Sequence, residues 1–409
     1  MNFPDTFFQN NRKTLRDNIG TNTPIVIVAN GLLQKGSDAT YPFHQDANFW
    51  YLTGINEPDI ILVIDSNQEF LIIPGRSEVR EFFDGATDSS SIEKTSGITT
   101  VVGQKAGWEM LSKIIKKSKK VATLAANPGY IKQLGMYTNP ARQNLIKHLK
   151  TIERSVEFID IRLTLASMRS LKQPIELQAI QKAIDITTET LSEVIKRTNF
   201  EKYRYENEIE ADISGGFRRR GADGDAFTPI VASGKRACTI HYDANNAKLG
   251  KNELVIMDVG AQFNNYAADI ARTVSVNKNP SERSQAVYNA VLEACEYAKS
   301  QLKPGVMMKE YELSVRQFIG KKLKELGLIK IINPKKLMRY YPHATSHFLG
   351  LEPHDAGDYS KPLQDGMVLA VEPGIYIAEE SIGVRIENNV LITTSGVKVL
   401  SGSLPCTLS

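Results

Sequence analysis

Three kinds of feature are scarce or missing, and each absence excludes a class of protein. No segment of the 409 residues reaches the roughly 18 consecutive apolar residues of a membrane-spanning helix, and the first residues, MNFPDTFFQNNRKTL, lack the apolar core of a signal peptide. Only three cysteines occur, at irregular spacing (Cys238, Cys295 and Cys406), which argues against a disulfide framework and favours reduced thiols. We therefore expect a cytoplasmic protein without a membrane partner.

Dense positive charge is also scarce. The formal net charge of +4 is spread over residues of both signs, and the one dense basic run, Arg218-Arg219-Arg220, is short and has acidic residues on either side. Such a run is typical of a solvated helix end, so we expect no nucleic-acid partner. An apolar content of 42% with 23% charged residues is typical of folded globular proteins rather than disordered ones.

Length and pattern predict two domains, because 409 residues exceed what one hydrophobic core usually supports. Over residues 1–168, short β-rich apolar runs alternate with helical patterns such as 107–118, which indicates an α/β domain. Pro174 favours the first turn of a new long helix, so the second domain is expected over 169–409. Its pattern predicts an α+β domain with an antiparallel sheet, including strands at 227–232 and 238–241.

Two aspartates lie in one predicted hairpin of the second domain. An apolar run ends at Asp258, and another returns from Asp269 after the turn residues Asn264-Asn265. A turn at this place puts both carboxylates on one side of the sheet, either directly opposite, with Cβ atoms about 5 Å apart, or one step diagonal. Two half-buried carboxylates so close would repel each other, which favours a cation between them. Two surface acids that cap a turn explain this pair equally well.

A second predicted hairpin repeats the arrangement with two glutamates. One strand ends at Glu372, before Pro373-Gly374, and the other returns through Arg385 to Glu387. The midpoint between the two glutamates falls in the polar segment Glu379-Glu380, so they are expected to face each other. Arg385 lies two residues before Glu387, hence on the same face, where it would orient that carboxylate from behind or form a structural ion pair.

Histidines cluster in the same domain. Three of them fall within twelve residues, in the run His343-Ala-Thr-Ser-His347-Phe-Leu-Gly-Leu-Glu-Pro-His354, and His241 lies further upstream. Gly350 and Pro353 interrupt any helix, so we expect a loop or short strand rather than a helical zinc pair. Any single histidine could be structural, but the set favours function.

Four carboxylates and one imidazole, Asp258, Asp269, His347, Glu372 and Glu387, make an oxygen-rich ligand set with a formal charge near −4. Two divalent cations would neutralise it, and hard or borderline metals suit such ligands. Two metals about 3.5 to 4 Å apart acidify a bridging water and polarise a carbonyl group, which is the chemistry of a hydrolase.

The order and context of these five residues resemble the pita-bread metallopeptidases of family M24B, which include methionine aminopeptidase, prolidase and aminopeptidase P. The contexts that carry the resemblance are Val371-Glu372-Pro373-Gly374 and Gly383-Val-Arg-Ile-Glu387-Asn388. The segment Tyr41-Pro-Phe-His-Gln-Asp-Ala-Asn-Phe-Trp-Tyr-Leu-Thr-Gly54 is similar to the N-terminal signature of bacterial and mitochondrial-type Xaa-Pro aminopeptidases. This resemblance implies a pita-bread catalytic domain preceded by a creatinase-type α/β domain.

The resemblance also implies a mechanism and a cofactor. Two divalent metal ions, with Mn²⁺ favoured over Co²⁺, Fe²⁺ or Zn²⁺, would activate a bridging hydroxide that releases the N-terminal residue of peptides with proline in second place. One ion would be held by Asp258, Asp269 and Glu387, and the other by Asp269, His347, Glu372 and Glu387. Glu372 would shuttle the proton, His241 and His354 would steady the oxyanion and the substrate, and His343 would contact the proline side.

Two further positions follow from the resemblance alone. Asp38 matches a residue that similar enzymes send into a neighbouring subunit's site, and Phe83 stands near the place of a tryptophan at the substrate mouth. A homodimer or homotetramer is therefore implied. The chain departs from the family pattern at His44 and Asn48, and in the contexts of Asn265-Tyr266 and Asp269-Ile-Ala-Arg272, which affects peptide-length preference and subunit contacts but removes no ligand.

Three alternatives remain at this point. A prolidase, restricted to Xaa-Pro dipeptides, would share every ligand. A pita-bread binding protein and a metal-free amidinohydrolase of the creatinase type are different classes of answer, because the fold alone does not dictate function. All five ligand positions are occupied by ligand residues, which favours the peptidase.

Overall fold

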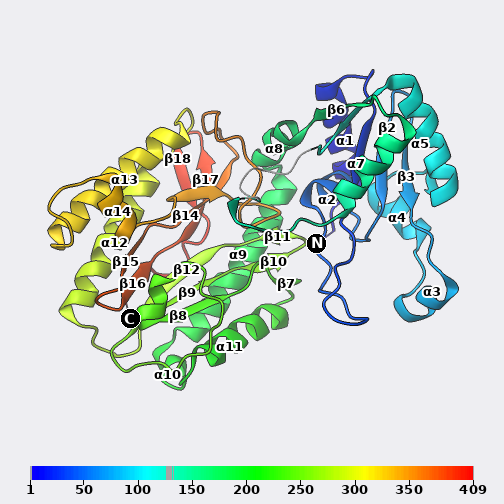
Figure 1. Cartoon of the computed structure of the whole chain (residues 1–409). Helices are drawn as coiled ribbons and strands as arrows, with labels where there is room; N and C mark the ends of the chain where they lie inside the picture. The colour runs from blue at the N-terminus through cyan, green and yellow to red at the C-terminus, as the bar shows by residue number, and fades with distance from the viewer. Residues whose placement is uncertain (1, 126–130, 132, 409) are drawn as a thin grey trace. The chain divides into compact units, whose positions relative to one another are not determined.

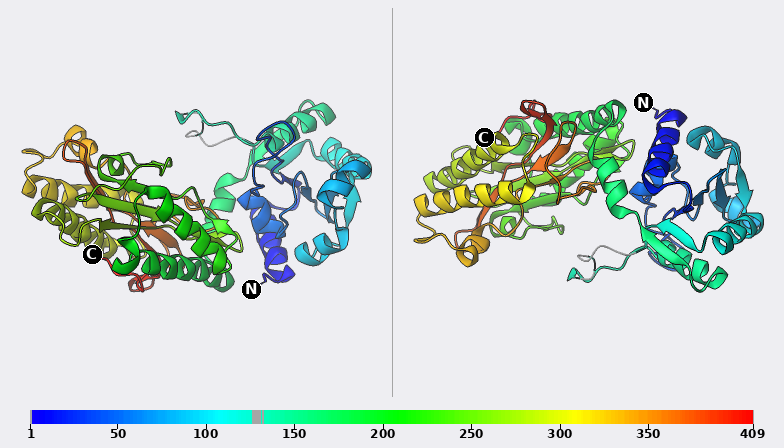
Figure 2. Two further views of the ribbon diagram at one scale, coloured as in Figure 1. Left: turned by 90° about the horizontal axis from the view of Figure 1, so that it is seen from below. Right: turned by 90° about the horizontal axis from the view of Figure 1, so that it is seen from above.

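The chain forms two compact units in the computed structural model, which describes residues 2–125, 131 and 133–408. One unit comprises Asn2–Met168 and the other Arg169–Ser409 (Figure 1). Figure 2 shows the chain from two further sides, with the first unit in blue to blue-green and the second in green to red. Among the described residues, no helix is long and apolar enough to cross a membrane.

A six-stranded mixed sheet forms the centre of the N-terminal unit, in the order β4-β3-β2-β1-β5-β6. Strand β2 runs antiparallel to both of its neighbours, whereas β1, β5 and β6 are parallel to one another and β3 is parallel to β4. The strands are β1 (Ile25–Val28), β2 (Ile61–Ile64), β3 (Glu69–Ile73), β4 (Val101–Gly103), β5 (Lys120–Thr123) and β6 (Glu157–Asp160).

Helices α5 and α7 pack against this sheet and form its core. Leu111 and Ile115 of α5 and Leu149 of α7 are fully buried beside Val26 and Phe70 of the sheet. The predicted α/β character of this part is thus confirmed. The helices of the unit are α1 (Asp5–Ile19), α2 (Ala47–Thr53), α3 (Glu78–Asp84), α4 (Ser89–Ser96), α5 (Gln104–Ser118), α7 (Ala141–Ile152) and α8 (Arg162–Ser170), which continues into the next unit.

The strand pairs of the C-terminal unit are antiparallel, as the sequence predicts. They form sheets in the orders β12-β9-β8, β13-β14-β17-β18, β15-β16 and β11-β10-β7. The strands are β7 (Gly224–Asp225), β8 (Ile230–Ser233), β9 (Leu254–Val259), β10 (Ala261–Phe263), β11 (Tyr266–Ala267), β12 (Ile270–Ser275), β13 (Ser346–Phe348), β14 (Val368–Val371), β15 (Gly374–Ile377), β16 (Ile382–Arg385), β17 (Asn388–Thr393) and β18 (Gly396–Val399).

Long helices supply the core of this unit. Pro174 occupies the first turn of α9, as predicted, where its missing N–H costs no hydrogen bond. Val291 of α12 and Val315 of α13 are fully buried in one cluster with Val371 and Val390 of the sheet. The helices are α9 (Pro174–Val194), α10 (Arg197–Phe200), α11 (Glu206–Arg219), α12 (Glu282–Gln301), α13 (Met308–Glu325) and α14 (Pro334–Tyr340).

One predicted strand of this unit is wrong. Residues 238–241 do not extend; a 3-10 helix (Gly234–Cys238) is followed by a turn. Gly234 has a φ of 56°, a conformation that glycine adopts without strain, and it ends β8 abruptly. The strand predicted at 227–232 is present but begins only at Ile230.

The first acidic hairpin turns at the predicted place. Asn264 and Asn265 have φ values of 48° and 65°, the left-handed pair that a type I′ hairpin turn requires. Asparagine tolerates this conformation better than most residues, so the sequence sets the turn. Beneath it, Gly260 lies so close to the opposite strand that a Cβ atom there would stand 1.7 Å from the carbonyl oxygen of Ala268.

Replacing Gly260 by alanine should therefore destabilise the C-terminal unit, because the neighbouring atom belongs to the backbone and cannot turn away. We expect a loss of about 2 kcal/mol or more in the free energy of unfolding, measured by urea denaturation. Gly402→Ala is the matched control, since a Cβ atom at that site would make only ordinary contacts, the nearest at 3.6 Å. Equal stability of the two variants would contradict this account.

Candidate functional site

Strand register brings the two aspartates together on one face. Ala271 of β12 lies opposite Asp258 of β9. Asp269 precedes Ala271 by two residues, so it occupies the diagonal position on the same side of the sheet. Of the two arrangements open to the predicted hairpin, the diagonal one is present.

The two glutamates face each other where two sheets meet. Val371 of β14 pairs with Asn388 of β17, and Gly374 of β15 pairs with Arg385 of β16. Extending either ladder places Glu372 opposite Glu387, as the sequence predicts. Neither glutamate belongs to a strand itself, and each lies at the junction where its chain passes from one sheet to the other.

His347 joins the four carboxylates from the short strand β13, which confirms a strand rather than a helix at this place. Its Nε2 lies 3.5 Å from Glu372 Oε1, 3.8 Å from Asp269 Oδ2 and 3.9 Å from Glu387 Oε1. Asp258 completes the cluster, because oxygens of Asp258, Asp269 and Glu387 all lie within 4.8 Å of one another. The five residues singled out in the sequence thus converge on one site.

The tautomer of His347 follows from its other nitrogen. Nδ1 lies 3.1 Å from the backbone carbonyl oxygen of Phe348. A carbonyl oxygen can only accept, so Nδ1 carries the proton and Nε2 presents a lone pair to the carboxylates. This is the state in which a histidine binds a metal, with its second nitrogen held by a backbone carbonyl.

The carboxylates are buried and incompletely satisfied. Asp258, Asp269 and Glu387 are 6%, 5% and 1% exposed. Within the described chain, Asp258 Oδ1 and Glu387 Oε2 are buried without a hydrogen-bond partner, although a buried charged oxygen normally has one. These oxygens therefore fit a cation that binds them. Three triplets have the spacing for an ion: Asp258–Asp269–Glu387, His347–Glu372–Glu387 and Asp269–His347–His354.

Burial and mutual repulsion shift the pKa values of the cluster. Burial raises the pKa of Asp269 and Glu387 well above the ordinary range, and the neighbouring carboxylates add to the shift. Burial likewise raises the pKa of Glu372 to about 8, against the opposing effect of Arg385. For the imidazole of His347, burial lowers the pKa to about 3. At neutral pH the metal-free site thus keeps a proton on Glu372 and none on this histidine.

Arg385 contacts a different acid from the one expected. Its guanidinium donates to Asp258 Oδ2, to the hydroxyl of Tyr376 (2.8 Å) and to the carbonyl oxygen of Ile240 (3.3 Å). The expectation that it orients Glu387 is therefore wrong. The reason is that Asp258, on the adjacent strand β9, lies within reach of the guanidinium, and sequence spacing within one hairpin cannot reveal a partner from another.

The other three histidines lie around the cluster. His343 Nδ1 stands 2.8 Å from the carbonyl oxygen of Ala344, so it carries the proton, and Nε2 accepts from Tyr376 at 2.7 Å. The ring of His354 stacks on that of His347 with centroids 4.0 Å apart. His241 is exposed and follows Ile240, whose carbonyl oxygen binds Arg385.

Two residues that support the site, Tyr376 and Asn389, were not predicted from the sequence. The hydroxyl of Tyr376 links His343 to Arg385, and register could have found it, because Tyr376 lies one diagonal step from Arg385. Asn389 binds the backbone of Asp269 twice, accepting from its N–H at 3.2 Å and donating to its C=O at 2.5 Å. No local signal marks Asn389, since its partner is 120 residues away.

Asp38 and Phe83 belong to the N-terminal unit, where both are exposed. Asp38 lies in a loop. Phe83 is 79% exposed on α3, next to Phe82, which is 86% exposed. Two adjacent exposed phenylalanines are unusual on a free surface.

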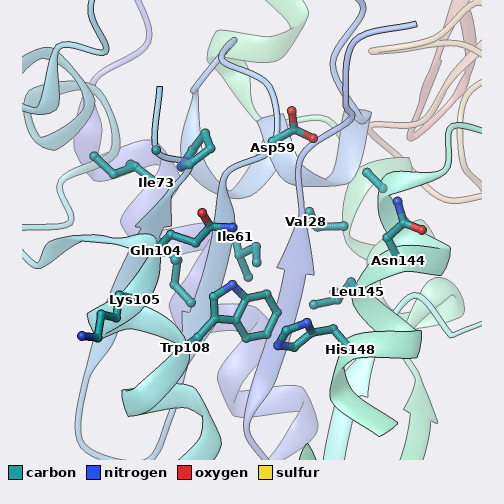
Figure 3. A pocket seen from close by; sticks show the side chains of 14 residues that line it. Val28, Asp59, Ile61, Ile73, Gln104, Lys105, Trp108, Asn144, Leu145 and His148 are labelled. Carbon is teal, nitrogen blue, oxygen red and sulfur yellow. The ribbon is translucent and has the colours of Figure 1, made fainter. Parts of the chain in front are cut away.

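The N-terminal unit also contains a pocket of about 640 Å³ (Figure 3). Val28, Ile61 and Leu145 are among the residues that line it, and the indole of Trp108 lies tilted by 35° beside the imidazole of His148, with ring centroids 3.8 Å apart. None of the residues singled out in the sequence lines it. The groups of metal-binding side chains found among the described residues lie in the other unit.

Fold and site together indicate a class of protein, a metal-dependent hydrolase, and comparison with known proteins agrees. The profile of metallopeptidase family M24 matches residues 178–394, and that of the aminopeptidase P N-terminal domain matches residues 8–123. The chain belongs to metallopeptidase family M24. Its C-terminal unit has the predicted pita-bread fold, and its N-terminal unit is the predicted α/β domain of that architecture.

Relatives match the chain along its length. The Xaa-Pro aminopeptidase of Haemophilus influenzae is 31% identical, over 98% of this chain and 95% of the relative. Two solved structures of Escherichia coli aminopeptidase P, one with the inhibitor Pro-Leu and one zinc-substituted with product, each match with a TM-score of 0.85. They are 27% and 28% identical and cover 100% of this chain and 97% of theirs. The chain is therefore a metal-dependent aminopeptidase.

The metal-stripped protein should lose stability as the pH rises from 6.5 to 8. In this range the folded state still keeps a proton on Glu372, whose pKa is about 8, whereas the unfolded state has released it. A raised carboxyl pKa makes stability fall with rising pH, here by about 2 kcal/mol from this group alone. Urea denaturation at half-unit pH steps measures the slope. In Glu372→Gln the slope should flatten, and an unchanged slope would contradict the assignment.

Proposed function

We propose that this aminopeptidase releases the N-terminal residue of peptides that have proline in second place. The observation that carries the proposal is the cluster itself: three acids lie within 4 Å of the lone pair of His347 Nε2, and Asp258 Oδ1 and Glu387 Oε2 are buried without a hydrogen-bond partner among the described residues. The preference for proline is supported by the names of the relatives that match both units, an Xaa-Pro aminopeptidase and aminopeptidase P structures. A cytoplasmic location accords with the three free cysteines.

Two divalent metal ions would occupy the cluster. Asp258, Asp269 and Glu387 would hold one, and Asp269, His347, Glu372 and Glu387 the other, so that Asp269 and Glu387 serve both. Two of the three ligand triplets share Glu387, and the third joins Asp269 to His347, which supports this division. Mn²⁺ is our first choice, because carboxylates dominate the donor set, with Co²⁺, Fe²⁺ and Zn²⁺ as alternatives. When bound, such a pair lowers the pKa of water and polarises the peptide carbonyl.

Glu372 would handle the proton of the reaction. Its carboxyl group is 15% exposed, so it is open enough to meet a substrate while burial keeps its pKa near 8 in the metal-free protein. A carboxyl group with a pKa near the working pH can accept a proton from water and return it to the leaving nitrogen. Bound cations would lower that pKa again, which favours the accepting form at the start of the cycle.

Three histidines would orient the substrate. His343 keeps its proton on Nδ1, held by the Ala344 carbonyl, and Tyr376 and Arg385 fix the ring from the other side. His354 and His241 are exposed, so their ring nitrogens are free to donate to a developing oxyanion or to the substrate chain. His343 would meet the proline side.

Hydrolysis of Ala-Pro-Ala and Ala-Pro, compared side by side, tests the proposal. The metal-stripped protein should be inactive, and added Mn²⁺ should restore release of alanine from the tripeptide. Glu372→Ala should lower kcat by at least 10²-fold, because a ligand and the proton carrier are lost together. Asp365→Ala, at an exposed acid of the same unit, is the control and should keep full activity.

The outcomes separate the candidate functions. Cleavage of the dipeptide alone would make the protein a prolidase. If neither peptide is cleaved with any divalent metal, the proposal is wrong. Full activity of Glu372→Ala would contradict it as well.

The active form would be a homodimer or homotetramer in which Asp38 reaches a neighbouring subunit's site and Phe83 lies near a substrate mouth. The exposed pair Phe82 and Phe83 supports such a contact, because burying them would remove an apolar surface from water.

The mass in solution, measured by light scattering, should be a multiple of the 45.5 kDa chain. A double variant, Phe82→Ser with Phe83→Ser, should shift it toward the single-chain mass. Leu163→Ser, at another exposed apolar residue, should not change it. A native protein that is monomeric at micromolar concentration would contradict the proposal.

A further inference from the structure

The segment between His343 and His347 is held by helix α13 (yellow in Figure 1). The carboxylate of Glu312 accepts the backbone N–H groups of Thr345 (2.9 Å) and Ser346 (3.0 Å) and the hydroxyl of Thr345 (3.0 Å). One turn further along the same helix, Arg316 donates to the carbonyl oxygen of His343 at 2.7 Å.

We propose that Glu312 and Arg316, here called the α13 clasp, are positioning residues for the metal centre. The hydrogen bonds described for them end on backbone groups and on the Thr345 hydroxyl, not on the carboxylate cluster or the imidazole rings. They act on the peptide groups between the two histidines, and so they set where the backbone of His343 and of His347 lies. This inference deepens the proposed function and rests on it.

The clasp also reaches the proton-carrying acid. The carbonyl oxygen of Thr345 accepts the backbone N–H of Glu372 at 2.8 Å. One carboxylate, on Glu312, therefore holds a short strand segment that in turn fixes two members of the cluster, His347 on one side and Glu372 on the other. Tyr311 and Tyr341 add hydroxyl contacts to Ser346 (2.8 Å) and Thr345 (2.6 Å) from the same side.

The arrangement has the geometry of an outer-shell support rather than of an ordinary helix contact. A carboxylate that accepts two consecutive backbone N–H groups aligns both peptide planes, which a single hydrogen bond does not do. Those peptide planes precede His347, whose Nε2 must point at three acids within 4 Å. Removal of outer-shell partners typically lowers metal affinity or activity by 10- to 100-fold.

Glu312→Gln tests the clasp with little change in shape. An amide oxygen in place of Oε1 can still accept the N–H groups of Thr345 and Ser346. The NH₂ group in place of Oε2 can no longer accept from the Thr345 hydroxyl, and it would face the Thr345 N–H, donor against donor. We expect affinity for Mn²⁺ alone, measured by calorimetric titration of the metal-stripped protein, to fall by about 10-fold or more. The midpoint of thermal unfolding of the metal-free variant should stay close to that of the native protein. Excess Mn²⁺ should restore part of kcat.

Glu310→Gln is the matched control, since Glu310 is exposed on the same helix and loses the same charge. It should bind Mn²⁺ like the native protein. If Glu312→Gln does not fold, Thr345→Val replaces it. This change removes the hydroxyl contacts with Glu312 and Tyr341 but keeps both backbone N–H bonds to the carboxylate, and it should lower the Mn²⁺ affinity several-fold.

The results distinguish this inference from the proposed function. A native protein that binds no divalent metal would overturn the metal centre itself. If the native protein binds Mn²⁺ and the Glu312→Gln variant binds it with an affinity within twofold of the native value, the role of the clasp is overturned, whatever the thermal stability of the variant. Helix α13 would then be a purely structural neighbour of the site.

Discussion

Repulsion among four buried carboxylates is the constraint around which the catalytic unit is organised. Asp258, Asp269, Glu372 and Glu387 converge with one imidazole in a space from which water is largely excluded. Such an arrangement costs free energy unless protons or cations neutralise it. In the metal-free protein burial raises the pKa of Asp269, Glu372 and Glu387, which favours neutralisation by protons, and in the loaded enzyme bound cations would take their place. Stability and catalysis therefore depend on the same charges.

The scaffold supports these acids by holding their backbone rather than their carboxylate oxygens. Asn389 binds the N–H and C=O of Asp269, and Arg272, which is buried, donates to the carbonyl oxygen of Glu387 at 2.5 Å. Glu387 donates its own N–H to Ala271, and Glu372 donates to Thr345. Because these contacts end on peptide groups, the side-chain oxygens stay available for a ligand. Arg385 is the exception, since it binds Asp258 directly.

The N-terminal unit is organised around a hydrophobic core rather than around clustered charges. Its sheet is mostly parallel and its core is closed by Leu111, Ile115 and Leu149 from helices packed on the sheet, without any of the cluster's acids. It presents Phe82 and Phe83 to solvent, a feature that its own stability does not need. The unit is thus a separate folding core whose surface, rather than its interior, would serve the enzyme.

The sequence alone determined those features that depend on residues close together in the chain and on the alternation of side chains along a strand. It placed the antiparallel character of the second unit, the turn at Asn264-Asn265 and the opposition of Glu372 to Glu387, because a strand's two-residue period sets which side chains share a face. Tertiary structure alone decided the partners of Arg385, the role of Asn389 and the support that Glu312 gives to the histidine segment. Those contacts join segments 33 to 127 residues apart, and no local periodicity records which distant groups meet when the sheets and helices pack.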